Sequence, residues 1–249
     1  MLLDHLHLAT RTARLAALAV IVAGLAGCQG IAGIQPVSQV RVIDASPDAP
    51  ALDIHQNSAV GLYNIGFGTV TSYIPIAAGA YTHAAYTTGT QQQLAAVRGI
   101  FAGGGQYTVL TGNIAANLQM TVLKDQSFAA PTGQVALRFL NQSTRPGAVD
   151  LYLLSPDSVL TGVSPIVSAA GFGSNTGYIN APSGTYSIVA YPSGTNPSSA
   201  ALPAYTGSQV SYPSGSAHTI ILIDQRPVEQ PAAMPSLQVI TAQDYDSAG

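Results

Sequence analysis

An internal repeat constrains the fold of this chain more than any other feature, because two similar stretches of sequence form two similar structures. Residues 66–86 (GFGTVTSYIPIAAGAYTHAAY) and residues 171–191 (GFGSNTGYINAPSGTYSIVAY) are identical at ten of 21 positions, with a constant separation of 105 residues. Residues 40–55 and 137–152 match more loosely at a separation of 97. The chain is therefore predicted to contain two tandem copies of one domain.

The predicted copies occupy residues 38–126 and 134–243, followed by a C-terminal tail at 244–249. Short runs rich in β-branched and aromatic residues recur in both copies, and turn-forming clusters of Gly, Pro, Ser and Asp separate them. Neither copy shows a convincing apolar period of 3.6 residues over the length of a helix. This pattern predicts an all-β fold in which each copy is an antiparallel β-sandwich.

The charge content excludes two classes of protein. Only 8% of the 249 residues are charged, with 8 Lys and Arg against 11 Asp and Glu. Eight scattered cations form no basic stripe that could follow a phosphate backbone, so we expect no nucleic-acid partner. The hydrophobic fraction of 47% is too high for a chain that stays unfolded for lack of apolar surface.

The N-terminus has the pattern of a lipoprotein signal peptide. Arg11 and Arg14 precede an uncharged apolar run over residues 15–25, which is too short to span a bilayer as a helix. The run ends in the tetrapeptide Leu25-Ala26-Gly27-Cys28, which resembles the lipobox of bacterial lipoproteins. We therefore predict a signal peptide at 1–27 and a lipidated linker at 28–37. An uncleaved membrane anchor is the alternative.

Cys28 is the only cysteine, so it cannot form a disulfide within the chain, and the resemblance implies that it carries acyl chains such as palmitate. Acyl chains hold a protein on a membrane because each buried CH₂ contributes about 0.8 kcal/mol. Gln29 follows, where lipoproteins retained at the inner membrane of diderm bacteria often have Asp. We therefore expect an exported protein anchored through Cys28, with the outer membrane favoured if the organism has one.

Residues that recur in both copies are expected to serve the shared fold rather than one active site. The recurring glycines and tyrosines are Gly66, Gly79 and Tyr81 in the first copy and Gly171, Gly184 and Tyr186 in the second. Gly79 and Gly184 are predicted to adopt a positive φ in a tight hairpin, after which the tyrosine packs on the sheet. A phosphate-binding loop at Gly171 is disfavoured, because no helix follows it.

Asp53 and Asp150 also recur, each at the start of a predicted strand. We expect their carboxylates to accept hydrogen bonds from backbone N–H groups of the preceding turn. A calcium site is the alternative, because Asp44 and Asp48 lie near Asp53 in the sequence and hard cations bind several oxygens. The second copy lacks counterparts of these two carboxylates. The turn role is therefore favoured, and neither a metal nor another cofactor is predicted.

Residues 41–53 (RVIDASPDAPALD), followed by residues 66–81 (GFGTVTSYIPIAAGAY), resemble the DUF4397 family of exported bacterial domains. The resemblance is close in the first copy and looser in the second, where NQSTRPG replaces DASPDAP, and together the copies cover nearly all of residues 38–242. It implies two tandem immunoglobulin-like antiparallel β-sandwich domains at the cell envelope or outside it. The family has no established activity, so the resemblance assigns no catalytic residue.

We expect no enzymatic activity. Three histidines follow the predicted signal peptide, His55, His83 and His218, and their counterparts in the other copy are aromatic or apolar, so packing is their expected role. No G-x-S-x-G motif occurs, and these histidines lack the close spacing of a zinc site. Glu229 is the only glutamate, which leaves no distinctive pair of carboxylates for glycoside hydrolysis.

The predicted function is therefore a non-catalytic structural or protein-interaction module of the cell envelope, with an envelope protein or a polysaccharide as its partner. A carbohydrate-binding or adhesion module is the alternative, in which exposed tyrosines stack on sugar rings. The tyrosines available for this role are Tyr63, Tyr205, Tyr212 and Tyr245. Clustering of these rings on one exposed face favours sugar binding, whereas burial or scatter favours the interaction module.

Overall fold

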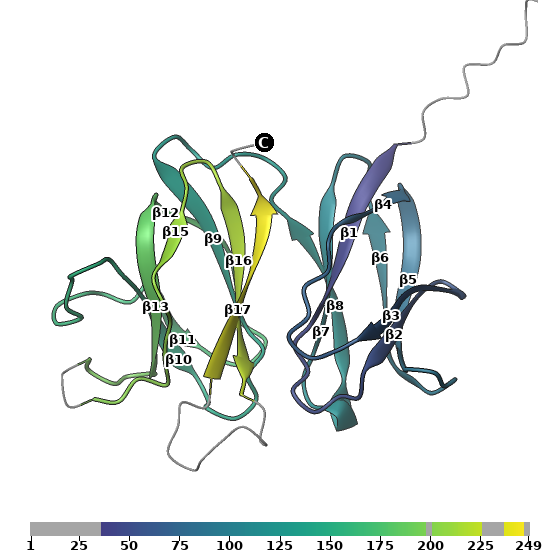
Figure 1. Ribbon diagram of the computed structural model, residues 1–249, viewed down its shortest axis with the longest axis horizontal. Helices are drawn as coiled ribbons and strands as arrows, with labels where there is room; N and C mark the ends of the chain where they lie inside the picture. Colours follow the sequence, from purple (N-terminus) through teal and green to yellow (C-terminus); the bar gives the residue numbers. More distant parts are fainter. Residues whose placement is uncertain (1–35, 198–200, 226–236, 247–249) are drawn as a thin grey trace, which may run out of the picture. The chain divides into compact units, whose positions relative to one another are not determined.

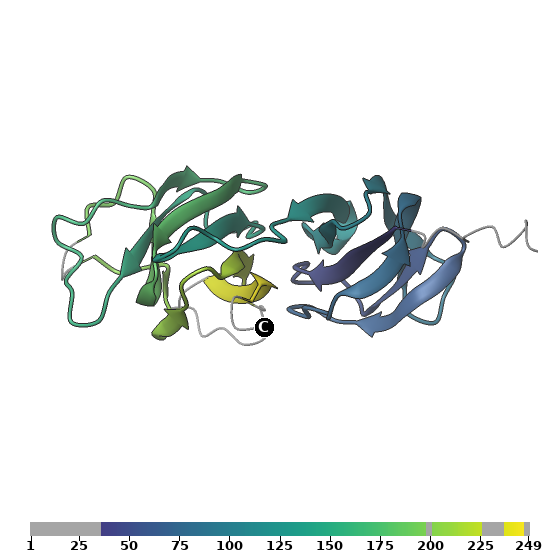
Figure 2. The ribbon, with the colours of Figure 1, turned by 90° about the horizontal axis from the view of Figure 1, so that it is seen from above.

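The computed structural model describes residues 36–197, 201–225 and 237–246, and the described residues from Val37 onward belong to one structural unit. Their strands form two β-sandwiches, coloured purple to teal and teal to yellow in Figures 1 and 2. The one helical element described is a single 3₁₀ turn, η1 (Ala115–Asn117). The predicted all-β fold class is confirmed.

The N-terminal sandwich contains the first eight strands. They are β1 (Val37–Asp44), β2 (Leu52–Gln56), β3 (Ala59–Ile65), β4 (Ile74–Ala77), β5 (Gly79–Thr87), β6 (Gln93–Phe101), β7 (Gln106–Gly112) and β8 (Gln119–Asp125). One sheet has the order β4-β1-β7-β8 and the other has the order β3-β2-β5-β6. Strands β3 and β4 are therefore edge strands of the two different sheets.

The C-terminal sandwich contains the remaining strands. They are β9 (Gln134–Asn141), β10 (Val149–Leu154), β11 (Val167–Ala170), β12 (Asn175–Pro182), β13 (Gly184–Pro192), β14 (Tyr205–Thr206), β15 (Val210–Tyr212), β16 (Ala217–Asp224) and β17 (Leu237–Tyr245). One sheet has the order β12-β9-β16-β17, and the other has the order β11-β10-β13-β14 with β15 also paired to β13. These orders correspond to those of the N-terminal sandwich, with β12, β9, β16 and β17 at the places of β4, β1, β7 and β8.

Each sandwich contains one parallel pair among otherwise antiparallel strands. Strand β1 pairs in parallel with β7, which sets Arg41 opposite Thr108, and β9 pairs in parallel with β16, which sets Arg138 opposite Thr219. Local alternation shows which side chains share a face but not which distant strands become neighbours. The sequence pattern therefore predicted the strand segments but not which strands pair in parallel.

Strand β16 shows how the cores are arranged, because all eight of its residues are buried. Successive side chains of a strand point to opposite faces. Ile220 and Leu222 belong to the core of the C-terminal sandwich, whereas Ile221 and Ile223 belong to a cluster that also contains Ile43 of β1. The long apolar run therefore reflects a strand covered on both faces.

The predicted positive φ at Gly79 and Gly184 is wrong. These glycines are the first residues of β5 and β13, with φ outside the left-handed region, because they pair with a neighbouring strand instead of turning. A Cβ added at Gly79 would lie 3.5 Å from the ring of Tyr81, which is two residues further along the same face. The tyrosine therefore covers the glycine.

Positive φ occurs instead two residues after the other recurring glycines. Gly68 and Gly173 have φ of 81° and 78°, and each donates its N–H to the end of a neighbouring strand. A Cβ added at any of these four glycines would meet no atom within 4 Å, but Gly66 and Gly171 have φ outside the left-handed region. The third position of each Gly-Phe-Gly phrase is therefore the one that requires glycine.

Candidate functional sites

A buried set of polar side chains, named here the Arg–Asp network, joins the two sandwiches. Its members form four pairs, with one residue of each pair from each sandwich: Arg41 and Arg138, Asp125 and Asp244, Thr108 and Thr219, Tyr73 and Tyr178. The parallel strand pairs set each arginine beside the threonine of its own sheet. The aspartates lie on the edge strands β8 and β17.

Arg41 bonds to its own sandwich through Nε and to the other sandwich through its Nη atoms. Its Nε donates to Thr108 Oγ1 at 2.9 Å, and its Nη2 forms an ion pair with Asp244. Its Nη1 donates to the backbone oxygen of Gln243 at 2.9 Å. The guanidinium lies over the ring of Tyr73, 4.7 Å from the centroid.

Arg138 makes the corresponding contacts from the opposite side. Its Nε donates to Thr219 Oγ1 at 3.0 Å, its Nη2 donates to Asp125 Oδ1 at 2.5 Å, and its Nη1 donates to the backbone oxygen of Lys124 at 3.1 Å. Its guanidinium lies 4.8 Å from the centroid of the Tyr178 ring. The network thus has the two-fold pattern of an isologous dimer interface, within a single chain.

Both carboxylates of the network are fully buried, and each accepts hydroxyl hydrogen bonds of 2.6–2.8 Å from the tyrosine and threonine of its own sandwich. Burial raises the pKa of the Asp244 carboxyl, and Arg41 opposes that rise. Burial lowers the pKa of the Arg138 guanidinium, but Asp125, Tyr178 and Asp244 together outweigh burial and the pKa rises. Burial, together with Asp125, also raises the pKa of Tyr73, which stays a proton donor.

The sequence contained only part of the signal for this network. Arg41 recurs as Arg138 and Tyr73 as Tyr178, but no role followed from their recurrence, and the aspartates were missed. The separation of 119 residues that aligns Leu118 with Leu237 also aligns the two aspartates. Extending that alignment to the ends of the last strands would have found them.

Burial of charge leaves the described outer surface nearly uncharged. Eight of the fourteen charged residues described are buried: Arg41, Asp44, Asp53, Asp125, Arg138, Asp150, Asp224 and Asp244. The six exposed ones are Asp48, Arg98, Lys124, Arg145, Asp157 and Asp246. Charged side chains in proteins are almost never fully buried unless they are paired. Here burial removes eight of the fourteen described charges from the solvent-facing surface.

The Asp53 carboxylate accepts backbone N–H groups, but from a residue of strand β3 and from the turn after β5 rather than from the preceding turn that the sequence suggested. Its Oδ1 accepts the N–H of Asn64 at 2.9 Å, and its Oδ2 accepts the N–H of Gly89 at 3.0 Å. Both donors have a positive φ, of 55° and 72°. The hydrogen bond from Gly89 and then that from Asn64 lower the pKa of Asp53, with a smaller contribution from Thr88.

Asp150 repeats this arrangement in the C-terminal sandwich. Its Oδ1 accepts the N–H of Ala169 at 2.6 Å and its Oδ2 accepts that of Gly194 at 3.0 Å, and both donors again have a positive φ. Burial raises the pKa of Asp150, but these hydrogen bonds and that of Ser193 outweigh burial and lower it. Each aspartate therefore binds one residue of an edge strand, Asn64 of β3 or Ala169 of β11, and one turn glycine, all with the backbone in the left-handed region.

The carboxylates considered for calcium bond to separate backbone groups. Asp44 Oδ1 accepts the N–H of Ser46 at 3.0 Å, and Asp48 Oδ1 accepts the N–H of Ala115 at 2.7 Å. Within the described ranges, no three His, Cys, Asp or Glu side chains come close enough to hold a metal ion.

The four tyrosines considered for sugar stacking do not gather on one exposed face. Tyr63 is 69% exposed, whereas Tyr212 is 1% exposed and belongs to the C-terminal core, where burial raises its pKa to about 12. Tyr205 is partly buried against the same core, and Tyr245 packs on a small alanine cluster. Tyr212 is therefore excluded as a sugar-stacking residue.

The three histidines all contact aromatic rings. His55 stacks on Tyr86 with ring centroids 4.1 Å apart, and His83 meets Phe101 edge-on at 5.2 Å. His218 meets the ring of Tyr212 edge-on, and its Nε2 lies 3.0 Å from a serine hydroxyl. Burial lowers the pKa of both His83 and His218.

A polar crevice of about 350 Å³ lies between β8 and the loop that precedes β12. Its lining combines amide and hydroxyl side chains with one exposed aromatic ring: Gln119, Thr121, Gln142, Ser174, Asn175 and Phe172. Phe172 is 43% exposed. Amides and hydroxyls offer both donors and acceptors, which is the chemistry that recognises an uncharged polar ligand.

The predicted signal motif, residues 25–27, and the predicted lipid attachment residue Cys28 lie outside the described residues. Among the residues that the structure describes, no helix has the length and hydrophobicity needed to cross a membrane.

Comparison with known families finds a domain described as "Domain of unknown function (DUF4397)" at residues 38–152. The match begins in β1 and ends in β10, so it extends past residue 126, the predicted end of the first copy. Residues 38–152 are therefore similar to this family. No curated protein matches the sequence.

Two solved structures show a distant likeness. One is described as "Alpha-glucan binding by a streptococcal virulence factor", at 8% identity over 74% of this chain and 92% of that chain. The other is a family CBM26 module, CBMbc, from Eubacterium rectale Amy13K in complex with maltoheptaose, at 10% identity over 85% and 99%. Both have a TM-score of 0.24, which is too low to carry an argument about this chain.

Proposed function

We propose that this protein is an exported, lipid-anchored and non-catalytic module that packs against an envelope protein. The observation that carries the proposal is the distribution of charge. The described surface has six charged residues, while eight others are buried. A high surface charge keeps proteins apart, and a surface with little charge favours association.

The Arg–Asp network supports the same proposal, because it joins the two sandwiches through buried ion pairs in both directions. A buried ion pair is costly to separate, since each charge would lose its partner before it regained water. Two sandwiches held in this way present one rigid surface, and a rigid surface loses little conformational entropy when it binds.

The anchor is tested by replacing Cys28. Cys28→Ala is expected to abolish incorporation of radiolabelled palmitate and to release the protein from the membrane fraction. Gln29→Ala, the adjacent matched control, is expected to keep both. Palmitate labelling of the Cys28→Ala variant at the parental level contradicts the lipid attachment.

The partner surface is tested by adding charge. Gln92→Lys and Ser168→Lys introduce cations at exposed positions, one on each sandwich. They are expected to reduce crosslinking of the membrane-bound protein to its partner without lowering the melting temperature. Arg98→Gln, which removes an exposed charge, is the control and is expected to leave crosslinking unchanged. Equal crosslinking of all variants contradicts an interaction through an uncharged surface.

Carbohydrate binding is the second candidate, and the polar crevice is the observation that favours it. Phe172 offers a face on which a sugar ring can stack, beside amide groups that can bond its hydroxyls. Phe172→Ala is expected to abolish retention on an immobilised polysaccharide. Phe128→Ala, at an exposed phenylalanine that does not line the crevice, is the matched control. Equal retention of the two variants contradicts binding in the crevice.

A further inference from the structure

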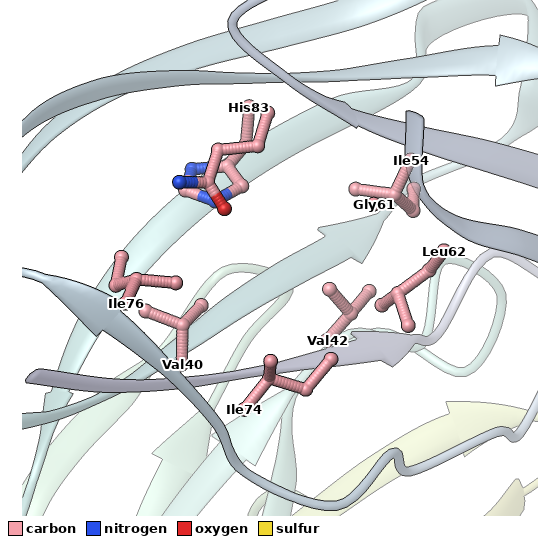
Figure 3. A pocket seen from close by; sticks show the side chains of 9 residues that line it. Val40, Val42, Ile54, Gly61, Leu62, Ile74, Ile76 and His83 are labelled. Carbon is pink, nitrogen blue, oxygen red and sulfur yellow. The ribbon is translucent and has the colours of Figure 1, made fainter. Parts of the chain in front are cut away.

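The N-terminal sandwich contains an apolar cavity of about 70 Å³ between its two sheets. Its walls come from β1, β2, β3, β4 and β5: Val40, Val42, Ile54, Leu62, Ile74 and Ile76, together with Gly61, Gln56 and His83. It opens beside the edge strands β3 and β4, where Ile74 is partly exposed. Figure 3 shows the ring of His83 on one side of this space and Leu62, Val42 and Ile74 on the other.

His83 is the unusual residue of this cavity. Its side chain is 3% exposed, and its Nδ1 has no hydrogen-bond partner among the described residues. Burial lowers the pKa of His83, which keeps the ring neutral near pH 7, with one nitrogen as donor and the other as acceptor. A buried polar atom without a partner destabilises the folded state. The unpartnered Nδ1 of His83 therefore contributes nothing to the stability of the folded state.

The C-terminal sandwich shows that the fold does not require a polar pair at this position. Gln56 of β2 lies directly opposite His83 of β5, and at the corresponding place Leu153 of β10 lies opposite Ile188 of β13. Both of these apolar residues belong to the C-terminal core or pack on it.

A residue of the cavity wall also differs between the two sandwiches. Val42 lies where the C-terminal sandwich has Phe139, a larger side chain that is buried in the core. The same framework thus exists with apolar side chains at the places of His83 and Gln56 and a larger one at the place of Val42. In the N-terminal sandwich the cavity is open and has a hydrogen-bonding end.

We infer that this cavity binds a small uncharged amphiphile, with an apolar body against the valine and isoleucine walls and one hydroxyl or carbonyl group bonded to His83. A volume of about 70 Å³ has room for about six heavy atoms. A short alkyl alcohol matches both the size and the single polar group. A charged ligand does not, because the walls offer no countercharge. The site does not depend on the function proposed above.

The direct test uses nuclear magnetic resonance of the imidazole nitrogens in the chain from Val37 onward, which contains His55, His83 and His218 and no other histidine. With 1-pentanol as the probe, saturable shifts are expected at His83 alone, with a dissociation constant of about 1 mM for so small a ligand. Pentylammonium and pentanoate, which are equal in length but charged, are expected to give no saturable shift. Shifts at all three histidines, or at none, would overturn the inference.

Two variants copy the C-terminal sandwich into the cavity. His83→Ile with Gln56→Leu removes the polar end, and Val42→Phe fills the space. Loss of the hydrogen bond alone is expected to weaken pentanol binding about fivefold, and loss of the space is expected to abolish it. The Val42→Phe variant keeps His83, so pentanol binding is still followed at the His83 resonance. The test therefore stays decisive even when the double variant at His83 and Gln56 folds poorly. Unchanged binding in a folded Val42→Phe variant would place the ligand elsewhere and refute the site.

Discussion

Asp244→Asn tests whether the Arg–Asp network holds the two sandwiches through charge. The substitution keeps the shape of the side chain but removes the negative charge that faces Arg41 and replaces one acceptor oxygen by a donor. Arg41 then stays buried, with Thr108 Oγ1 and the backbone oxygen of Gln243 as its remaining hydrogen-bond partners and Asp125 Oδ2 at 3.7 Å from its Nη2. Removing one member of a buried ion pair costs about 4 kcal/mol. For a unit of this size, that loss lowers the melting temperature by about 8–16 °C.

The assay is urea denaturation and calorimetry of the chain from Val37 onward, with Asp157→Asn as the matched control. Asp157 is exposed and has a positive φ of 59°, which Asn tolerates, so the same chemical change is expected to cost almost nothing there. Asp125→Asn is expected to cost as much as Asp244→Asn, within about 1 kcal/mol, because the two carboxylates have corresponding donors.

The combination of Asp244→Asn with Arg41→Met completes a double-mutant cycle. If the charges are coupled, the double variant loses less stability than the sum of the single variants, by at least about 1 kcal/mol. Additive losses, or a loss for Asp244→Asn no larger than that for Asp157→Asn, would refute the argument that charge joins the sandwiches.

Three further predictions concern single positions. Because the pKa of Asp150 is lowered in the folded state, its carboxylate contributes fully to stability above the ordinary pKa of 3.8, and this contribution is lost as the pH falls through the lowered pKa. Asp150→Asn is therefore expected to lose less stability than the parent on titration from about pH 5 to pH 2. Parallel curves of stability against pH would contradict this. Gly68→Ala is expected to cost about 1 kcal/mol because of the positive φ, whereas Gly66→Ala is expected to be neutral or slightly stabilising; equal urea midpoints would disprove the assignment. Gln29→Asp is expected to move the lipidated protein from the outer to the inner membrane fraction of a diderm host, and an unchanged distribution would argue against sorting by this residue.

The fold was largely predictable because its determinants are local. Alternating β-branched residues and turn clusters gave the all-β class, and the Gly-Phe-Gly phrases marked corresponding loops in both sandwiches. The error at Gly79 shows the limit of such reasoning. A glycine followed by a tyrosine two residues later suits a hairpin and also suits a strand in which the ring covers the glycine, and the neighbouring strand decides between them.

The candidate sites were less predictable because they depend on contacts between distant residues. Arg41 and Asp244 are 203 residues apart, and each sits on a different sandwich. A repeat in the sequence shows that two structures are alike but not which of their surfaces meet. The difference between His83 and Ile188 was visible in the alignment and suggested only packing. That Nδ1 of His83 lacks a partner among the described residues is decided by the side chains around it.

By itself, then, the sequence determined the strand-forming segments, the correspondence between the two halves and the positions where glycine recurs, because each depends on residues close together in the chain. Only the tertiary structure decided the parallel strand pairs, the burial of most described charges and the open cavity beside His83. The physical reason is that pairing, burial and empty space are properties of surfaces brought together by folding, and the same local pattern is compatible with many such arrangements.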